Sequence, residues 1–149
     1  MIALIRLCLE SVHLVIKVSG VIRRGRKGEP VNLVRLERHQ HPSPPQHELR
    51  NRGVYASTGR YLGHVAHLYV DDDRKLRFVD VMTGGLLGLG RKHHLIPIEA
   101  ITEQSVNAIT LGVDEETVEG APTIPNPLAG PDENHQRALY EHYGYPSPG

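Results

Sequence analysis

The chain has 149 residues, and its 17 Lys and Arg balance 17 Asp and Glu, so the formal net charge is zero. This length accommodates one domain with a tail. Without Trp and with a single Phe, the core must consist mainly of Val, Leu and Ile, which favours strands. The single cysteine, Cys8, excludes an intrachain disulfide and is compatible with a reducing compartment, so we expect a cytoplasmic protein.

The charge is distributed unevenly along the chain. Residues 1–50 contain nine Lys and Arg against four acidic residues, residues 51–124 seven against ten, and residues 125–149 one against three. This asymmetry indicates either a basic arm that contacts a partner or an ordinary solvated segment.

Residues 1–18 are predicted to form an amphipathic helix, with a strand or disorder as alternatives because Val and Ile are frequent. Polar residues spaced by four, three and four positions form one narrow stripe on a helix, namely Arg6, Glu10, His13 and Lys17. The charges interrupt any signal peptide or membrane span. The helix would therefore dock on a partner or a second copy, lie on a membrane surface, or cover its own domain.

The segment that follows has the composition of a linker. It contains a basic run at residues 23–28, a brief apolar stretch at 31–36 and a Pro-rich stretch at 41–45, which favours extended chain. We therefore assign residues 1–47 to an N-terminal arm that consists of the helix and this linker.

Residues 48–124 have the pattern of a β-domain. Short apolar segments between turn residues predict strands at 54–56, 62–70, 76–82, 94–98 and 105–111. The charged run at 71–75 predicts a solvated hairpin turn, and residues 99–102 a second turn. Asp114 is expected to cap a helical turn that ends at Glu119. We expect this span to fold without the rest of the chain.

Residues 125–149 form a Pro- and Tyr-rich tail. Acidic residues at its start and Gly144 at its end predict a short helix over Asp132–Tyr143. Its aromatic side chains either pack on the domain or are presented to a partner. We therefore take Tyr140 and Tyr143 as candidate binding residues.

Two motifs carry a resemblance to a known family. They are GVYASTGRYLGHV at residues 53–65 and MTGGLLGLGRKHHLIP at residues 82–97. Across residues 48–124 the chain resembles the PRC-barrel family. Its members are small β-barrels similar to the cytoplasmic domain of the reaction-centre H subunit and to the C-terminal domain of the ribosome-maturation protein. The resemblance implies a mainly β fold, a small PRC-type β-barrel, here with an N-terminal helix and linker arm and a short C-terminal helix.

The glycines of residues 84–90 are expected to be structural. Gly85 and Gly90 have the spacing of a phosphate-binding loop, but Arg91 and Lys92 follow them instead of Lys and Ser or Thr. We expect at least one glycine at positive φ, and we take Arg91 and Lys92 as candidate binding residues. The three aspartates at 71–73 lack the spacing of a calcium loop. We therefore expect no enzyme activity, no cofactor and no small-molecule substrate.

Three histidine pairs occur in the chain, at residues 39 and 41, 64 and 67, and 93 and 94. The first pair would share a face of a strand, as a two-ligand clasp for Zn²⁺ or Ni²⁺. No third ligand follows at a diagnostic spacing, so we predict surface histidines and no metal site. His93 and His94 are expected on opposite faces of a strand, one outward and the other packed.

These observations favour a non-catalytic PRC-barrel adaptor that binds a protein partner or a second copy of itself. The alternative is an RNA- or ribosome-associated protein that contacts phosphates through the basic residues of its N-terminal arm.

Overall fold

The computed structural model describes residues 32–44, 48–84, 90–126 and 128–147. The predicted helix over residues 1–18, the basic run at 23–28 and the middle of the glycine-rich connection lie outside these residues.

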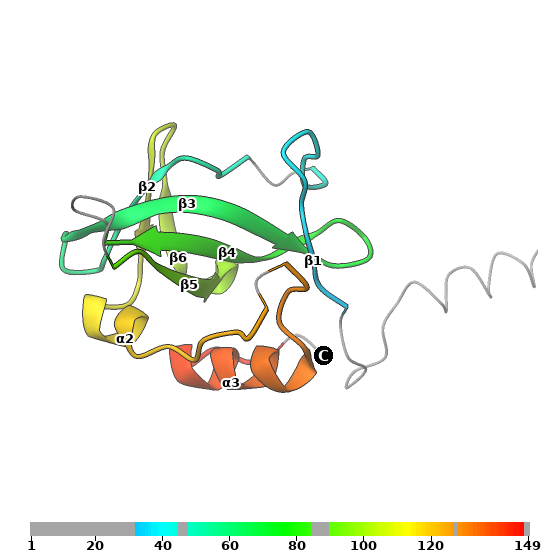
Figure 1. Cartoon of the computed structure of the whole chain (residues 1–149). Helices are drawn as coiled ribbons and strands as arrows, with labels where there is room; N and C mark the ends of the chain where they lie inside the picture. The colour runs from blue at the N-terminus through cyan, green and yellow to red at the C-terminus, as the bar shows by residue number, and fades with distance from the viewer. Residues whose placement is uncertain (1–31, 45–47, 85–89, 127, 148–149) are drawn as a thin grey trace, which may run out of the picture. The chain divides into compact units, whose positions relative to one another are not determined.

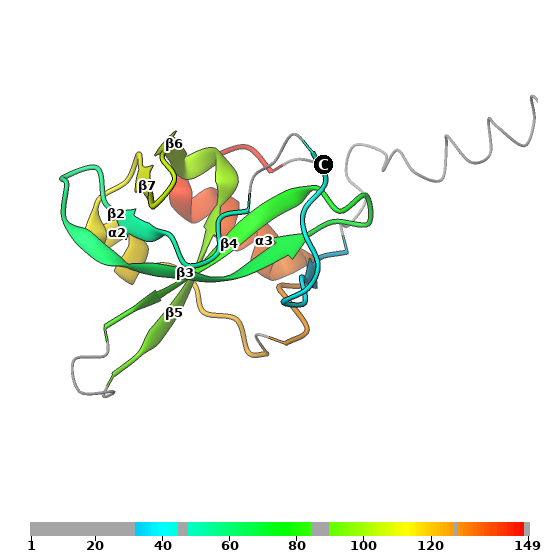
Figure 2. The ribbon, with the colours of Figure 1, turned by 90° about the horizontal axis from the view of Figure 1, so that it is seen from above.

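In the described part of the chain, seven strands form one sheet that curls into a half-barrel (Figures 1 and 2). The order is β5-β4-β3-β2-β7-β6, and β1 pairs with β3. All neighbours are antiparallel except β2 and β7, which are parallel. The predicted mainly β fold is therefore confirmed. The strands are β1 (Val34–Arg35), β2 (Gly53–Tyr55), β3 (Tyr61–Val70), β4 (Leu76–Thr83), β5 (Lys92–Pro97), β6 (Ile101–Gln104) and β7 (Ala108–Leu111).

The core follows from the alternation of apolar residues on these strands. Most of β4 is buried on both of its faces, because the rest of the sheet and the helices cover it. Gly63 of β3 lies so close to β4 that a Cβ would stand 1.9 Å from the Met82 carbonyl oxygen. The fully buried side chains include Val54, Val65, Leu68, Phe78, Val79, Val81, Ile96, Ile109, Leu111 and Leu139.

Two α-helices follow the sheet, and both have the predicted caps. The Asp114 carboxylate accepts a hydrogen bond from the Thr117 N–H at the start of α2 (Glu115–Glu119). Asp132 accepts from the His135 N–H at the start of α3 (Glu133–Tyr143). Gly144 ends α3 with a φ of 77°, a conformation that favours glycine.

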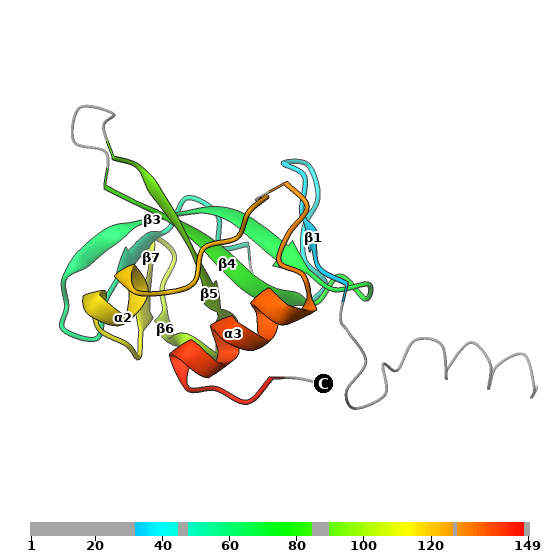
Figure 3. The ribbon, with the colours of Figure 1, turned by 60° about the horizontal axis from the view of Figure 1, so that its bottom comes forward.

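The segment between α2 and α3, together with α3 itself, covers one face of β4 and β5 (Figures 1 and 3). The Tyr140 ring of α3 lies 5.0 Å from the Phe78 ring of β4, centroid to centroid. Leu33 and Leu36, which precede residue 48, are buried as well. The core therefore includes residues before and after 48–124, and the independent folding of that span stays a prediction.

Two local predictions are corrected. Residues 98–104, expected to contain a turn, form the 3₁₀ helix η2 (Ile98–Ala100) and then β6. The hairpin turn lies later, where the Ser105 hydroxyl bonds to the backbone of Ala108. The 71–75 turn is present but not wholly solvated, because Asp71 is buried and accepts hydrogen bonds from two backbone N–H groups and Arg77.

No helix in the described part of the chain has the length and apolar content that crossing a bilayer requires.

Candidate functional site

The glycine-rich connection leads directly to one pair of predicted site residues. Gly84 and Gly90, which flank its central residues, both have a φ of 73°, so the prediction of positive φ is confirmed. Arg91 and Lys92 follow at the start of β5 and are exposed to solvent.

Lys92 lines an open groove of about 370 Å³ between the ends of β3, β4 and β5 and helix α2. The groove contains cationic, anionic and aromatic side chains, so its surface is mixed rather than apolar. Its lining residues are Arg60, Tyr61, Leu62, Thr83, Gly84, Gly90, Lys92, Glu115, Val118 and Glu119.

An exposed aromatic pair borders this groove. Tyr61 of β3 pairs with Tyr55 of β2, and their ring centroids lie 5.4 Å apart in an edge-to-face arrangement. Tyr61 is 57% exposed and Tyr55 37%, although both belong to well-packed strands. Gly53 lies beside them, and a Cβ at this position would be in van der Waals contact with the Tyr61 ring, at 3.4 Å.

Helix α2 is fixed to the same edge by Glu115. Its carboxylate accepts a hydrogen bond from the Thr58 hydroxyl at 2.8 Å and lies 3.8 Å from the Arg60 guanidinium. Hydrogen bonds from its own backbone N–H and from Thr58 lower the pKa of the Glu115 carboxyl. The β2–β3 turn and α2 therefore present Arg60 and Tyr61 on a rigid base.

The second pair of predicted site residues is in a different environment. Tyr140 and Tyr143 are 2% and 6% exposed and belong to the contact between α3 and the sheet. Burial raises the pKa of both phenols. In this conformation they pack within the chain, which is one of the two roles that the sequence left open.

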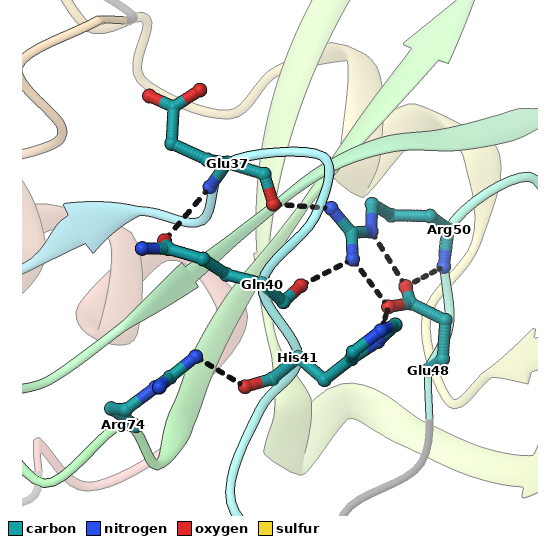
Figure 4. A network of polar contacts seen from close by, with 6 residues as sticks. All are labelled: Glu37, Gln40, His41, Glu48, Arg50 and Arg74. Carbon is teal, nitrogen blue, oxygen red and sulfur yellow. Dashed lines mark hydrogen bonds and ion pairs between the residues drawn. The ribbon is translucent and has the colours of Figure 1, made fainter.

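A polar cluster near the chain's Pro-rich segment is centred on Glu48 and Arg50 (Figure 4). The Arg50 guanidinium donates to both carboxylate oxygens of Glu48 and to the carbonyl oxygens of Glu37 and Gln40. His41 Nδ1 lies 3.1 Å from the same carboxylate. The hydrogen bond from Arg50 holds the pKa of Glu48 at about 2. This cluster joins the segment after β1 to the start of β2.

A second carboxylate, Asp80 of β4, lies between two imidazoles. His67 Nδ1 is 2.8 Å and His93 Nδ1 2.9 Å from the same oxygen, Oδ2. The pairing explains the arrangement, because His67 on β3 is directly opposite Asp80 and His93 on β5 is opposite Met82, two residues along β4. His67 and His93 are partly exposed, as the prediction of surface histidines has it, but their connection to Asp80 was not predicted.

The sequence offered one signal for this cluster. Asp80 is the one acidic residue of a mostly apolar strand that also contains Arg77, and a buried charge requires a partner. The neighbouring His94 faces the other way, as predicted, and is buried. Its Nε2 lies 3.1 Å from the Thr83 hydroxyl, and burial lowers the pKa of its imidazole.

Comparison with known families agrees with this architecture. Residues 45–118 match the family model described as the PRC-barrel domain. No curated protein matches the chain.

Proposed function

Because the chain belongs to the PRC-barrel domain family, whose members are in general protein-interaction modules, we propose that it is a non-catalytic adaptor that binds another protein. The observation that carries this proposal is the exposed Tyr55–Tyr61 pair beside the groove that Arg60 and Lys92 line. Tyrosine and arginine are enriched among the residues that dominate binding energy at protein interfaces.

The surface has the properties of an interface rather than of a substrate pocket. The groove is open, and its aromatic residues lie on paired strands that hold them in place. Rigid aromatic side chains lose little entropy on binding. The opposite charges of Lys92 and Glu119 would set the orientation of a partner more than they would add affinity. A cytoplasmic location, which the single cysteine favours, is part of the same proposal.

The test is affinity capture with the full chain, followed by direct binding of each captured protein in purified form. The double variant Tyr55→Ser and Tyr61→Ser removes the two exposed aromatic rings. We expect affinity to fall about 30-fold or more, since such anchors contribute about 2 kcal/mol or more. Val34→Ser is the control, because Val34 is 52% exposed and pairs with Val70, at the opposite end of β3 from Tyr61.

The outcomes separate the alternatives. A protein partner that is lost with the double variant and retained with Val34→Ser supports the adaptor. Self-association that depends on Tyr55 and Tyr61 identifies the partner as a second copy. Capture that disappears after ribonuclease treatment, with both variants still active, supports the RNA-binding alternative through the N-terminal arm and overturns this proposal. So does an identical set of partners for all three proteins.

A further inference from the structure

The strongest unassigned cluster in the described structure is formed by His67, Asp80 and His93. Each contributes one ligand atom, and the three atoms lie within 4.8 Å of one another. The two Nδ1–Oδ2 separations of 2.8 and 2.9 Å are slightly shorter than the roughly 3.4 Å between two ligands of a tetrahedral ion with bonds of about 2.1 Å. Only small side-chain shifts would therefore admit an ion.

The carboxylate itself is incompletely satisfied. Asp80 is 2% exposed, and its Oδ1 has no hydrogen-bond partner within the described structure. Its ion-pair partners there are the two histidines, which are cationic only when protonated. A buried carboxylate without a permanent cation is costly. A divalent ion would supply the missing charge.

Solvent can reach the cluster from one side. The side chains of His67 and His93 are 37% and 41% exposed. Behind them lies a cavity of about 10 Å³, lined by Asp80 and His93 together with Tyr69, Leu95, Pro122 and Ile124. This volume is close to the minimum that holds one water molecule. The site is therefore accessible, and it has room for a small bound species but not for an organic ligand.

We propose that His67, Asp80 and His93 bind a divalent transition-metal ion, with Zn²⁺ as the expected occupant. Two imidazole nitrogens and one carboxylate oxygen suit Zn²⁺, Ni²⁺ or Cu²⁺ better than Mg²⁺ or Ca²⁺, which prefer oxygen ligands. Coordination through Nδ1 requires only that neutral imidazoles carry their proton on Nε2. Three protein ligands leave a coordination position open to water or to a group from a partner.

The test is a Zn²⁺ titration of the full chain in competition with a chromophoric chelator. All proteins carry Cys8→Ser, which removes the single thiol as a source of binding. We expect one tight equivalent in this parent. His93→Gln and His67→Gln should each lower the affinity by at least the roughly 10- to 100-fold that loss of a mere outer-shell partner costs.

His135→Gln is the matched control. His135 also forms a pair with an aspartate, with Nδ1 at 2.7 Å from Asp132 Oδ1, but that pair has no third ligand in the described structure. Its loss should leave Zn²⁺ affinity unchanged. As a second measurement, Zn²⁺ should raise the melting temperature of the parent and of His135→Gln, because a ligand of the folded state stabilises that state. It should not raise that of the two ligand variants.

Co²⁺ provides the structural readout. A protein-bound Co²⁺ ion with two nitrogen ligands should give visible absorption bands in the parent that are absent in Asp80→Asn. The proposal is overturned if the His67 and His93 variants bind Zn²⁺ as tightly as the parent. It is also overturned if the parent itself binds no Zn²⁺, or if the His135→Gln control loses affinity to the same extent as the two ligand variants.

Discussion

Glu48 and Asp80 are two carboxylates held in opposite ways. Glu48 is 35% exposed and is paired with the guanidinium of Arg50, a cation at any physiological pH (Figure 4). Asp80 is almost wholly buried and faces two imidazoles, one of its oxygens being without a hydrogen bond in the described structure. The better buried charge is therefore the less well compensated one.

These environments indicate a structural role for Glu48 and an ion-binding role for Asp80. Arg50 connects Glu48 to two backbone carbonyls, so its hydrogen bonds hold two chain segments together, residues 37–40 and residues 48–50. The partners of Asp80 are imidazoles, which can themselves coordinate a metal ion together with the carboxylate. We therefore expect substitutions at the Glu48 cluster to change stability most, and substitutions at Asp80 to change ion binding most.

The largest effect is expected for Arg50→Ala. The variant leaves the Glu48 carboxylate without its cation and the Glu37 and Gln40 carbonyls without their donor. We expect the free energy of unfolding, measured by urea denaturation, to fall by about 2–4 kcal/mol. Arg52→Ala is the control. The Arg52 side chain makes one hydrogen bond in the described structure, to the Ser105 carbonyl oxygen, and its loss should cost about 1 kcal/mol or less. If the two variants lose the same free energy of unfolding, the proposed structural role of the Glu48 cluster is contradicted.

A smaller effect is expected on acidification. The pKa of Glu48 is about 2 in the folded protein, against an ordinary value of 4.5. A carboxyl with a lowered pKa stabilises the fold above pH 4.5, and this stabilisation is lost as the pH falls towards 2. Since the side chain is partly exposed, solvent screening reduces the contribution to about 1 kcal/mol. Between pH 5 and pH 2, the free energy of unfolding should depend less on pH for Glu48→Gln than for the unmodified protein. The same pH dependence in both proteins would contradict this assignment.

The smallest effect on stability is expected for Asp80→Asn in metal-free protein. Removal of a buried charge should offset the loss of its hydrogen bonds to the imidazoles, so the free energy of unfolding should change by about 1 kcal/mol or less. The measurement is the same urea denaturation, with a chelator present. A loss as large as that of Arg50→Ala would show that Asp80 is a structural anchor of the same kind as Glu48.

The sequence predicts the strands and helix caps well because each depends on local pattern. Asp114, Asp132 and Gly144 occur at the predicted helix ends, since capping involves residues only a few positions away. The same holds for Gly84 and Gly90, whose positive φ is a local property. β6 is missed because residues 101–104 are mostly exposed, and an edge strand of this kind lacks the alternation that identifies its neighbours.

The candidate sites are less predictable because they depend on register. In sequence His67 has His64 as its nearest histidine, and His93 has His94, yet the strand pairing unites one member of each pair around Asp80. A shift of one residue would turn the side chains to the other face. The burial of Tyr140 and Tyr143 was unpredictable for another reason. The sequence predicts a helix with aromatic residues, but it does not show which surface of the protein that helix packs against.

The parallel pairing of β2 with β7 has a consequence for how the protein folds. Val54 is directly opposite Ile109, so nearly the whole described sheet lies within the loop that this contact closes. The hairpins β3–β4, β4–β5 and β6–β7 join residues that are close in sequence and can form early. Closure of the half-barrel must wait for the two ends to meet, at the entropic cost of a long loop. We expect this step to set the folding rate, and until it is complete β2 and β7 each expose an unpaired edge on which a newly made chain could aggregate.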